Sequence, residues 1–313
     1  MGHRFFKTSG SSGEEKWIAL SEKALEWSAR SVIEALEISE SDVLGLVLPR
    51  IHVGGYGLVL RAKLSRASLV EFEGRWDARS FASWCEEQAV TVLSLVPTQV
   101  YDLMVGKIQA AKSLRVIVVG GGALEDELCM AARALGWPVL PSYGMTETSS
   151  QIATGDGLPL LPGWEARVEE GRLALKGGGL LSAVIRRQGT SFESVDPKVD
   201  GWFLTNDRAE VTSTGLRILG RSDRLVKVLG ELIDLDELER FWSDVVGEEV
   251  AIIAKADERR GVNLILYFEG EGEKLEELNA SLPGPERVRS WRRVSSLPRS
   301  ALGKIDRASL SKF

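Results

Sequence analysis

Short, almost uninterrupted apolar segments alternate with amphipathic ones between residues 42 and 145 of this chain. The apolar segments read DVLGLVLP, SLVEF, VTVLSLVP and LRVIVVGG, and segments such as DARSFASWCEEQA and EDELCMAARALG stand between them with apolar residues at helical spacing. Strands that are apolar on both faces are typical of a parallel sheet covered by helices on both sides. We therefore predict an α/β fold with a layered parallel sheet, and we expect ligands to bind beyond the carboxyl ends of its strands.

The pattern predicts further elements on either side of this region. A helix is expected over residues 22–36, with Ser21 as its N-cap. From about Pro159 short strands joined by Gly-rich turns replace the helices, which indicates a small β subdomain over residues 159–220. Residues 221–313 have the composition of a compact α+β module. We thus expect a large domain, 1–220, whose α/β part is 1–158, and a C-terminal α+β domain, 221–313.

Composition excludes several classes of protein. A hydrophobic fraction of 44% in 313 residues is enough for globular cores, and a net charge of −6 gives no field for neutralising the phosphates of nucleic acid. The two cysteines, Cys85 and Cys129, predict neither a disulfide framework nor a metal cluster. We find no secretion signal and no apolar run near the ~18 residues of a membrane span, so we expect a cytoplasmic protein.

A loop rich in glycine and hydroxyl groups is predicted close to the start of the chain, in TSGSSGEEK. Backbone amides and hydroxyls of such a loop can surround phosphate oxygens while an ammonium group supplies positive charge. A solvated linker has the same composition, and the two glutamates before the lysine work against an anion. The residues concerned are Thr8, Ser9, Gly10, Ser11, Ser12, Gly13 and Lys16.

Two more candidate loops follow predicted strands. In VVGGGAL, three glycines permit the close approach of a flat ligand or a phosphate, although a tight strand-to-helix turn needs the same residues. In PSYGMTETSSQIAT, an aromatic ring, a hydroxyl and a carboxylate suited to Mg²⁺ occur within five residues, where a plain polar loop is the alternative. The candidate residues are Gly120, Gly121, Gly122, Tyr143, Thr146 and Glu147.

Three candidates lie in the last third of the sequence. Asp207, in GWFLTNDRAEV, occupies a predicted turn and can accept hydrogen bonds from two ribose hydroxyls or from its own backbone. The charged segment GRSDRLVKVLGELI, which begins at Gly220, coincides with the change of composition and is either a solvated linker or a hinge. Lys304 follows a glycine in LPRSALGKIDR, where an exposed lysine without a role is the alternative.

Six of these stretches occur in the order found in the adenylate-forming enzymes, the family of acyl-CoA synthetases, peptide-synthetase adenylation domains and luciferases. The chain resembles that family from Thr8 to Arg307. The segment SYGMTETSSQIAT, with LPRIHVGGYG upstream, is most similar to the o-succinylbenzoate–CoA ligases of menaquinone synthesis. In the relatives a further N-terminal region usually precedes the phosphate loop, so we expect a shortened member of the family. Self-association into a homo-oligomer is one way to cover the face that this region protects.

The resemblance implies a role for each matching residue. The loop from Thr8 to Gly13, with Lys16, is expected to hold the phosphates of ATP. Adenine is expected beside Ser142, Tyr143 and the three glycines, and ribose beside Asp207 and Arg221. The remaining roles are the α-phosphate for Thr146, Mg²⁺ for Glu147, the acyl pocket for His52, the hinge for Asp223 and the approach of pantetheine for Gly230.

The resemblance also implies a reaction in two steps. A carboxylic acid attacks ATP to give an acyl-adenylate and pyrophosphate, and coenzyme A then displaces AMP. Lys304 is expected to serve the first step, after which the C-terminal domain swings about Asp223 and brings Gly230 towards the thiol. Two alternatives stay open, namely an adenylating enzyme that loads a carrier protein and a nucleotide-binding protein that has lost catalysis.

Overall fold

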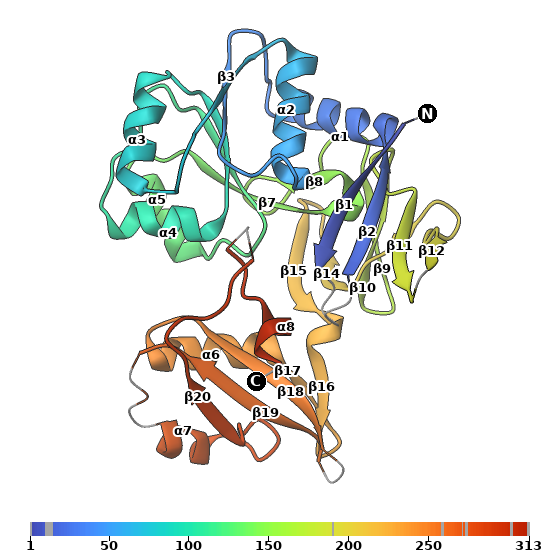
Figure 1. Cartoon of the computed structure of the whole chain (residues 1–313), viewed down its shortest axis with the longest axis vertical. Helices are drawn as coiled ribbons and strands as arrows, with labels where there is room; N and C mark the ends of the chain where they lie inside the picture. Colours follow the sequence, from blue (N-terminus) through green and yellow to red (C-terminus); the bar gives the residue numbers. More distant parts are fainter. Residues whose placement is uncertain are drawn as a thin grey trace. The chain divides into compact units, whose positions relative to one another are not determined.

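The computed structural model describes residues 2–9, 15–189, 191–257, 260–270, 272, 275–300 and 303–311 (Figure 1). The chain divides into two compact units. Of the described residues, those within 2–205 and 209–217 form the first unit, and 206–208 with those within 218–311 form the second. The chain passes between them within the hairpin of β14 (Asp207–Val211) and β15 (Leu216–Arg221), at whose end we placed the domain boundary.

A six-stranded sheet forms the centre of the first unit. Its order is β4 (Ser68–Glu71), β3 (Val43–Leu46), β5 (Val92–Leu95), β6 (Val116–Val119), β7 (Val139–Met145) and β8 (Ser150–Thr154). The first five strands are parallel, which confirms the predicted sheet, and β8 runs antiparallel to β7. The sequence did not indicate β8, because its residues SQIAT read as part of a polar loop.

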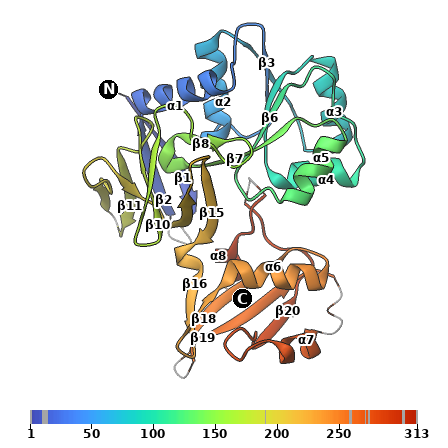
Figure 2. The same ribbon diagram turned by 180° about the vertical axis from the view of Figure 1, so that it is seen from behind.

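Five α-helices cover the two faces of this sheet, as predicted. In Figures 1 and 2, α1 and α2 lie together on one side of the strands, and α3, α4 and α5 lie on the other. Ser21 caps α1 as expected, since its hydroxyl accepts a hydrogen bond from the amide of Ala24 at 3.1 Å. The helices are α1 (Glu22–Ala35), α2 (Val53–Ser65), α3 (Ala78–Glu87), α4 (Pro97–Val105) and α5 (Asp126–Ala134).

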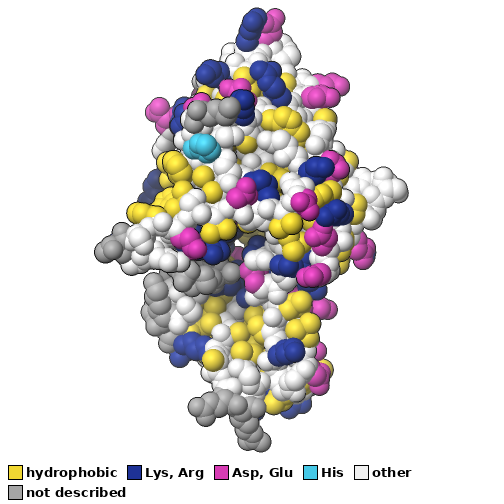
Figure 3. Space-filling view, turned by 90° about the vertical axis from the view of Figure 1, so that its right-hand side faces the viewer, with side chains coloured by type: hydrophobic (Ala, Val, Ile, Leu, Met, Phe, Trp, Pro, Cys, Tyr) yellow, Lys and Arg dark blue, Asp and Glu magenta, His cyan; other side chains and the backbone are white. Residues whose placement is uncertain are grey.

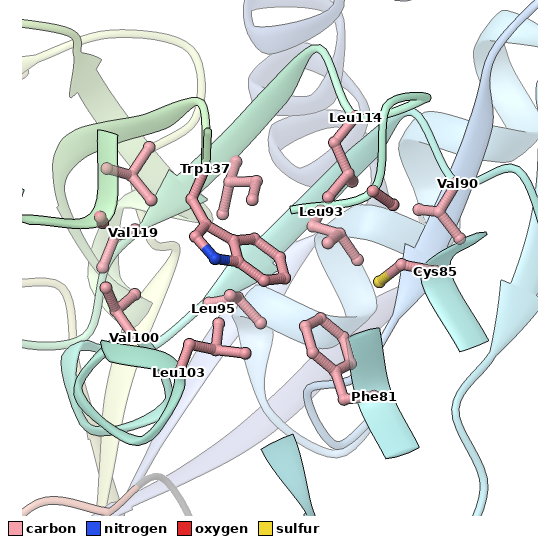
Figure 4. Close-up of a cluster of buried hydrophobic side chains, with 14 of the residues drawn as sticks. Phe81, Cys85, Val90, Leu93, Leu95, Val100, Leu103, Leu114, Val119 and Trp137 are labelled. Atoms are coloured by element: carbon pink, nitrogen blue, oxygen red, sulfur yellow. The ribbon is translucent and has the colours of Figure 1, made fainter. Parts of the chain in front are cut away.

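Trp137 fills the core between the sheet and helices α3 to α5 (Figure 4). Its ring stacks on that of Phe81 with centroids 6.2 Å apart, and its indole nitrogen donates a hydrogen bond to the carbonyl of Ile108 at 2.8 Å. Both cysteines also lie in this core. Burial raises the pKa of the Cys85 thiol to about 12 and also raises the pKa of Cys129, so neither thiol is reactive near neutral pH.

Two paired strands, which the sequence did not indicate, flank the predicted loop near the start of the chain. Strands β1 (His3–Ser9) and β2 (Glu15–Ser21) pair with each other and join β11 (Ala183–Gln188) and β12 (Ser191–Val195) in an antiparallel sheet. Phe6 and Ile18 face each other across the hairpin and are buried. The hairpin was missed because the strand that orders it, β11, lies far along the sequence.

Shorter β elements complete the first unit, and an α+β fold forms the second. In the second unit β19 pairs antiparallel with β18 and parallel with β20, and the sheet has a buried cluster on each face. The strands that complete the first unit are β9 (Glu165–Glu169), β10 (Arg172–Lys176) and β13 (Phe203–Leu204). The elements of the second unit are β16 (Leu225–Val228), β17 (Glu231–Asp234), α6 (Leu235–Val246), β18 (Val250–Asp257), β19 (Gly261–Phe268), α7 (Leu275–Ser281), β20 (Ser290–Arg293) and α8 (Arg307–Leu310).

Asp42 joins three strands of the large sheet at their amino ends. Its carboxylate receives hydrogen bonds from the Arg115 guanidinium at 2.8 Å, from the Thr91 hydroxyl at 2.7 Å and from the amide of Ser39 at 2.9 Å. The Arg115 guanidinium is the main cause that lowers the pKa of this buried carboxyl to about 2. Because Arg115 also donates to the carbonyl of Leu36, the cluster ties the end of α1 to β3, β5 and β6.

The Asp42→Asn variant should be less stable than the native protein by about 2 kcal/mol at pH 7, since the shift from 3.8 to about 2 measures how strongly the fold favours the carboxylate. A lowered folded-state pKa stabilises the protein above pH 3.8, and this stability is lost as the pH falls towards about 2. Urea denaturation at several pH values should therefore show a gap between the two proteins that closes in acid. An equal gap at pH 7 and pH 3 would contradict this account.

Candidate functional site

The turn after β7 is fixed by hydrogen bonds, and it presents Glu147. A short 3₁₀ helix, η1 (Thr146–Thr148), follows the strand. The fully buried Thr148 hydroxyl accepts a hydrogen bond from the amide of Met145 at 3.0 Å and approaches the carbonyl of Ser150 at 2.7 Å. The carbonyl of Glu147 accepts from the amide of Leu181 at 2.8 Å. The backbone beneath the Glu147 side chain is thus anchored on both sides.

Lys16 on β2 meets this carboxylate. The Lys16 ammonium lies 2.9 Å from Oε1 of Glu147, and the two side chains are 29% and 13% exposed. Thr8 is the cross-strand neighbour of Lys16, so both side chains are on one face of the hairpin. The hydroxyl oxygen of Thr8 is buried and has no hydrogen-bond partner among the described residues, so a bound ligand could satisfy it.

The glycines after β6 lie beside β7. A side chain at Gly120 would come within 3.3 Å of the Ser142 hydroxyl, and Gly121 has a positive φ of 83°, which favours glycine. Ser142 and Tyr143 belong to β7, the strand that leads into the turn with Glu147. The structure therefore brings together the residues assigned to adenine and those assigned to phosphate and metal within the first unit.

Asp207 and Arg221 meet in the second unit. The Arg221 guanidinium lies 3.2 Å from the buried Asp207 carboxylate and donates two hydrogen bonds of 2.8 Å to Asp223, the residue assigned to the hinge. Asp223 lies in the short 3₁₀ helix η2 (Ser222–Arg224). One guanidinium thus contacts both the candidate ribose ligand and the candidate hinge.

The remaining assigned residues occupy turns, or lie outside the described residues. Gly230 is at the tip of the β16–β17 hairpin with a φ of 89°, and no atom of the described residues lies within 4 Å of the position of a side chain there. Lys304 is exposed in a turn in which its carbonyl accepts a hydrogen bond from the amide of Ser300 at 2.8 Å. Of the predicted phosphate loop, Gly10 to Gly13 and the side chain of Ser9 lie outside the described residues.

His52 and Arg61 lie on α2, and the sequence drew attention only to the first. His52 stands at the N-cap of the helix, where its Nε2 is buried without a hydrogen-bond partner among the described residues. Burial lowers the pKa of the imidazole below its ordinary value. Arg61 is only 2% exposed and donates a hydrogen bond to the Ser150 hydroxyl at 3.0 Å. Burial lowers the pKa of its guanidinium to about 10.

In the described part of the chain no aspartate or glutamate pairs with Arg61, and its Nε is buried without a hydrogen bond. A buried guanidinium is costly unless an anion compensates it, so this position indicates a binding site for a negatively charged ligand. The sequence could have indicated Arg61 by its position three residues after Leu58, on the apolar face of α2. However, a charged residue at such a position is hard to distinguish in sequence from one at the exposed edge of the helix.

The residues fit a magnesium ion that is shared with a nucleotide better than an ion held by protein alone. Among the described residues no group of three or more His, Cys, Asp or Glu side chains is placed to hold a metal. Mg²⁺ is commonly bound by one or two carboxylates together with substrate phosphates, and Glu147, with the cation of Lys16 and the orphan hydroxyl of Thr8 beside it, meets that requirement.

The surface has a mixed character. On the face in Figure 3, side chains of lysine and arginine stand among those of aspartate and glutamate, with hydrophobic side chains between them. Several surface ion pairs account for this mixture, among them that of Arg217 with Glu210 at 2.6 Å. In the part of the chain that the structure describes, the helices are too short or too polar to cross a membrane.

Comparison with known proteins identifies the class. The AMP-binding enzyme family matches residues 6–174, more than half of the chain, and the chain belongs to this family. The predicted relationship to the adenylate-forming enzymes is thereby confirmed.

Among individual proteins, the chain is similar to acid–CoA ligases. The chain is 27% identical to a 2-succinylbenzoate–CoA ligase of Listeria monocytogenes over 97% of its own length and 68% of the relative's. It is 28% identical to an indoleacetate–CoA ligase of Aromatoleum aromaticum, covering 95% of this chain and 64% of that one. The expected similarity to the o-succinylbenzoate–CoA ligases is confirmed.

Solved structures share the fold. The o-succinylbenzoate CoA synthetase of Bacillus subtilis, in complex with its acyl-adenylate intermediate, superimposes with a TM-score of 0.84 at 24% identity, over 98% of this chain and 68% of that one. A variant of Escherichia coli MenE with bound OSB-AMS gives a TM-score of 0.77 at 26% identity, over 98% of this chain and 67% of that one. The predicted fold class is confirmed.

Proposed function

We propose that this protein is an ATP-dependent acid–CoA ligase that activates o-succinylbenzoate, an aromatic acid with two carboxylates, for menaquinone synthesis. The observation that carries the proposal is the meeting of Lys16 and Glu147, 131 residues apart in the sequence, beside the strand that bears Tyr143. This pair supplies a cation for phosphate oxygens and a carboxylate for Mg²⁺, which are the two charges that phosphoryl chemistry on ATP requires. The relatives named for this reaction support the choice of acid.

The first step is attack of a substrate carboxylate oxygen on the α-phosphorus of ATP. The bond from that phosphorus to the bridging oxygen breaks, pyrophosphate leaves with the electron pair, and no enzyme nucleophile is needed. Mg²⁺, held by Glu147, supplies neutralisation of phosphate charge when it is bound. Lys16 and the Thr8 hydroxyl orient the phosphates, and the Thr146 hydroxyl donates to the α-phosphate.

The second step joins the acyl group to coenzyme A. The thiolate of coenzyme A attacks the acyl carbon of the mixed anhydride, and AMP leaves. We assign Lys304 to the first step, as a mobile point charge between the carboxylate and a phosphate oxygen. We assign to Asp223 the rotation of the predicted C-terminal domain, residues 221–313, that replaces Lys304 by Gly230.

Arg61 explains why the acid should carry a second carboxylate. Its guanidinium is buried, lacks an acidic partner in the described residues and has an unsatisfied Nε. A carboxylate of the substrate that does not react would satisfy this group with a charge-assisted hydrogen bond. A monocarboxylic acid of similar size would leave the guanidinium uncompensated, so the site should discriminate against it.

The proposal also covers compartment and assembly. We propose that the enzyme is cytoplasmic, because ATP and coenzyme A are available in the cytoplasm and the two buried thiols stay reduced there.

Phe5 and Phe192 are 57% and 65% exposed on the sheet of β1, β2, β11 and β12. Self-association through this apolar surface is our expectation, and sedimentation equilibrium of the native protein and of Phe192→Glu tests it.

Mass spectrometry tests the function directly. The protein is incubated with ATP, Mg²⁺, coenzyme A and a panel of aryl acids that includes o-succinylbenzoate, and acyl-CoA products are sought. A thioester of o-succinylbenzoate supports the proposal. Pyrophosphate exchange with a stable adenylate but no thioester would point instead to loading of a carrier protein, and the absence of both reactions would refute ligase activity.

Lys304→Ala should slow acyl-adenylate formation by about 10²- to 10³-fold, because it removes a charge that acts only in the first step. Conversion of preformed acyl-adenylate to the thioester should change by less than about threefold. Single-turnover measurements of each half-reaction separate the two effects. Lys255→Ala, in the same unit, is the matched control. Equal losses in both half-reactions would show that Lys304 does not have the assigned role.

Arg61→Met should reduce kcat/KM for o-succinylbenzoate by about 10²-fold, the usual effect of removing one member of a buried charge pair. For benzoate, which has no second carboxylate, the same variant should retain activity within about threefold. The measurement is the ratio of the two kcat/KM values, which cancels a general loss of folded enzyme. An unchanged ratio would exclude Arg61 from substrate recognition.

A further inference from the structure

The ion pair between Lys16 and Glu147 has a consequence for metal binding. Both residues are assigned to the Mg²⁺–ATP complex, and in the structure they contact each other at 2.9 Å. The backbone on both sides of the contact is held in place, because β2 keeps Lys16 in register between Thr8 and Arg186, and the carbonyl of Glu147 is anchored by the amide of Leu181. The two charges are therefore placed together by elements that the fold fixes independently.

The Lys16 ammonium group and Mg²⁺ compete for the Glu147 carboxylate. At 2.9 Å the ammonium occupies one coordination direction of the carboxylate, and the two cations repel each other strongly in a partly buried site. Since Glu147 is the single acidic residue assigned to the metal, Lys16 competes with the ion for it, and the ion binds more strongly once Lys16 has moved away. The triphosphate would offer Lys16 an alternative anion for a charge-assisted hydrogen bond.

We propose that Lys16 is the resident counter-ion of Glu147 and exchanges this carboxylate for the ATP phosphates when Mg²⁺ binds. This inference rests on the proposed function, because it needs ATP as the ligand of the site. The exchange makes Lys16 a positioning residue for the metal as well as a phosphate ligand. It keeps the lone carboxylate paired in the empty enzyme and makes metal binding conditional on nucleotide.

The test compares the effect of Mg²⁺ on ATP binding in matched variants. The dissociation constant of ATP is measured by calorimetry in EDTA and in saturating Mg²⁺, and the ratio of the two values reports how strongly the metal assists binding. In Lys16→Met this ratio should rise about fivefold, the equivalent of an ion pair of ~1 kcal/mol that no longer has to break. In Lys16→Arg, which keeps the charge, the ratio should stay native.

Two controls isolate the pair. Lys176→Met removes one positive charge from another ion pair of the same unit, at 3.6 Å from Glu165, and should leave the ratio unchanged. In a Glu147→Gln background the substitution of Lys16 should produce no further rise. Without nucleotide, the melting temperatures of the two single variants and the double variant should be non-additive, because either substitution alone breaks the same contact.

Three results would overturn the inference. The first is a native ratio in Lys16→Met. The second is a rise that persists with Glu147→Gln, which would trace the effect to repulsion at the phosphates. In both cases thioester formation by the native enzyme would leave the proposed function intact. The third is a native protein that does not bind ATP, which would refute the function and the inference together.

Discussion

The candidate site depends on the pairing between β2 and β11. This pairing attaches the N-terminal hairpin to a strand more than 160 positions away, and in doing so it fixes Lys16 and Thr8 beside the turn that carries Glu147. The buried face of the same hairpin, with Phe6 and Ile18, provides the apolar contact that holds it there. The pairing of the strands therefore assembles the charges of the proposed phosphate site, since neither segment has both charges alone.

Much of the large sheet could be predicted because its signal is local. Buried parallel strands and amphipathic helices have distinct periods, and Ser21 has the side chain that begins α1. The N-terminal hairpin could not be predicted in this way. Whether Thr8 and Lys16 belong to a loop or to two paired strands is decided by β11. A single sequence does not show that this distant strand is the partner.

The candidate site, like the fold, could be predicted only in part. Residue types and spacing suggested Glu147, Lys16 and Asp207, and the resemblance to the adenylate-forming enzymes added Arg221. The structure places the four residues as two close pairs. Arg61 was not suggested, because a charged residue on a helix becomes informative only when its burial and the absence of an acidic partner in the described residues are known. The sequence thus indicates which groups have suitable chemistry, whereas burial identifies the group that lacks compensation.

The low reactivity of Cys85 and Cys129 makes the protein suitable for spectroscopy. Both thiols lie in the core of the first unit, and burial raises the pKa of each. A maleimide dye or a spin label would therefore react almost exclusively with cysteines introduced on the surface. One cysteine in place of the exposed Tyr101 and another in place of the exposed Leu232 would give a donor and an acceptor, one on each unit. Distance distributions between two such labels would follow the C-terminal unit through the catalytic cycle without removal of any native residue from the core.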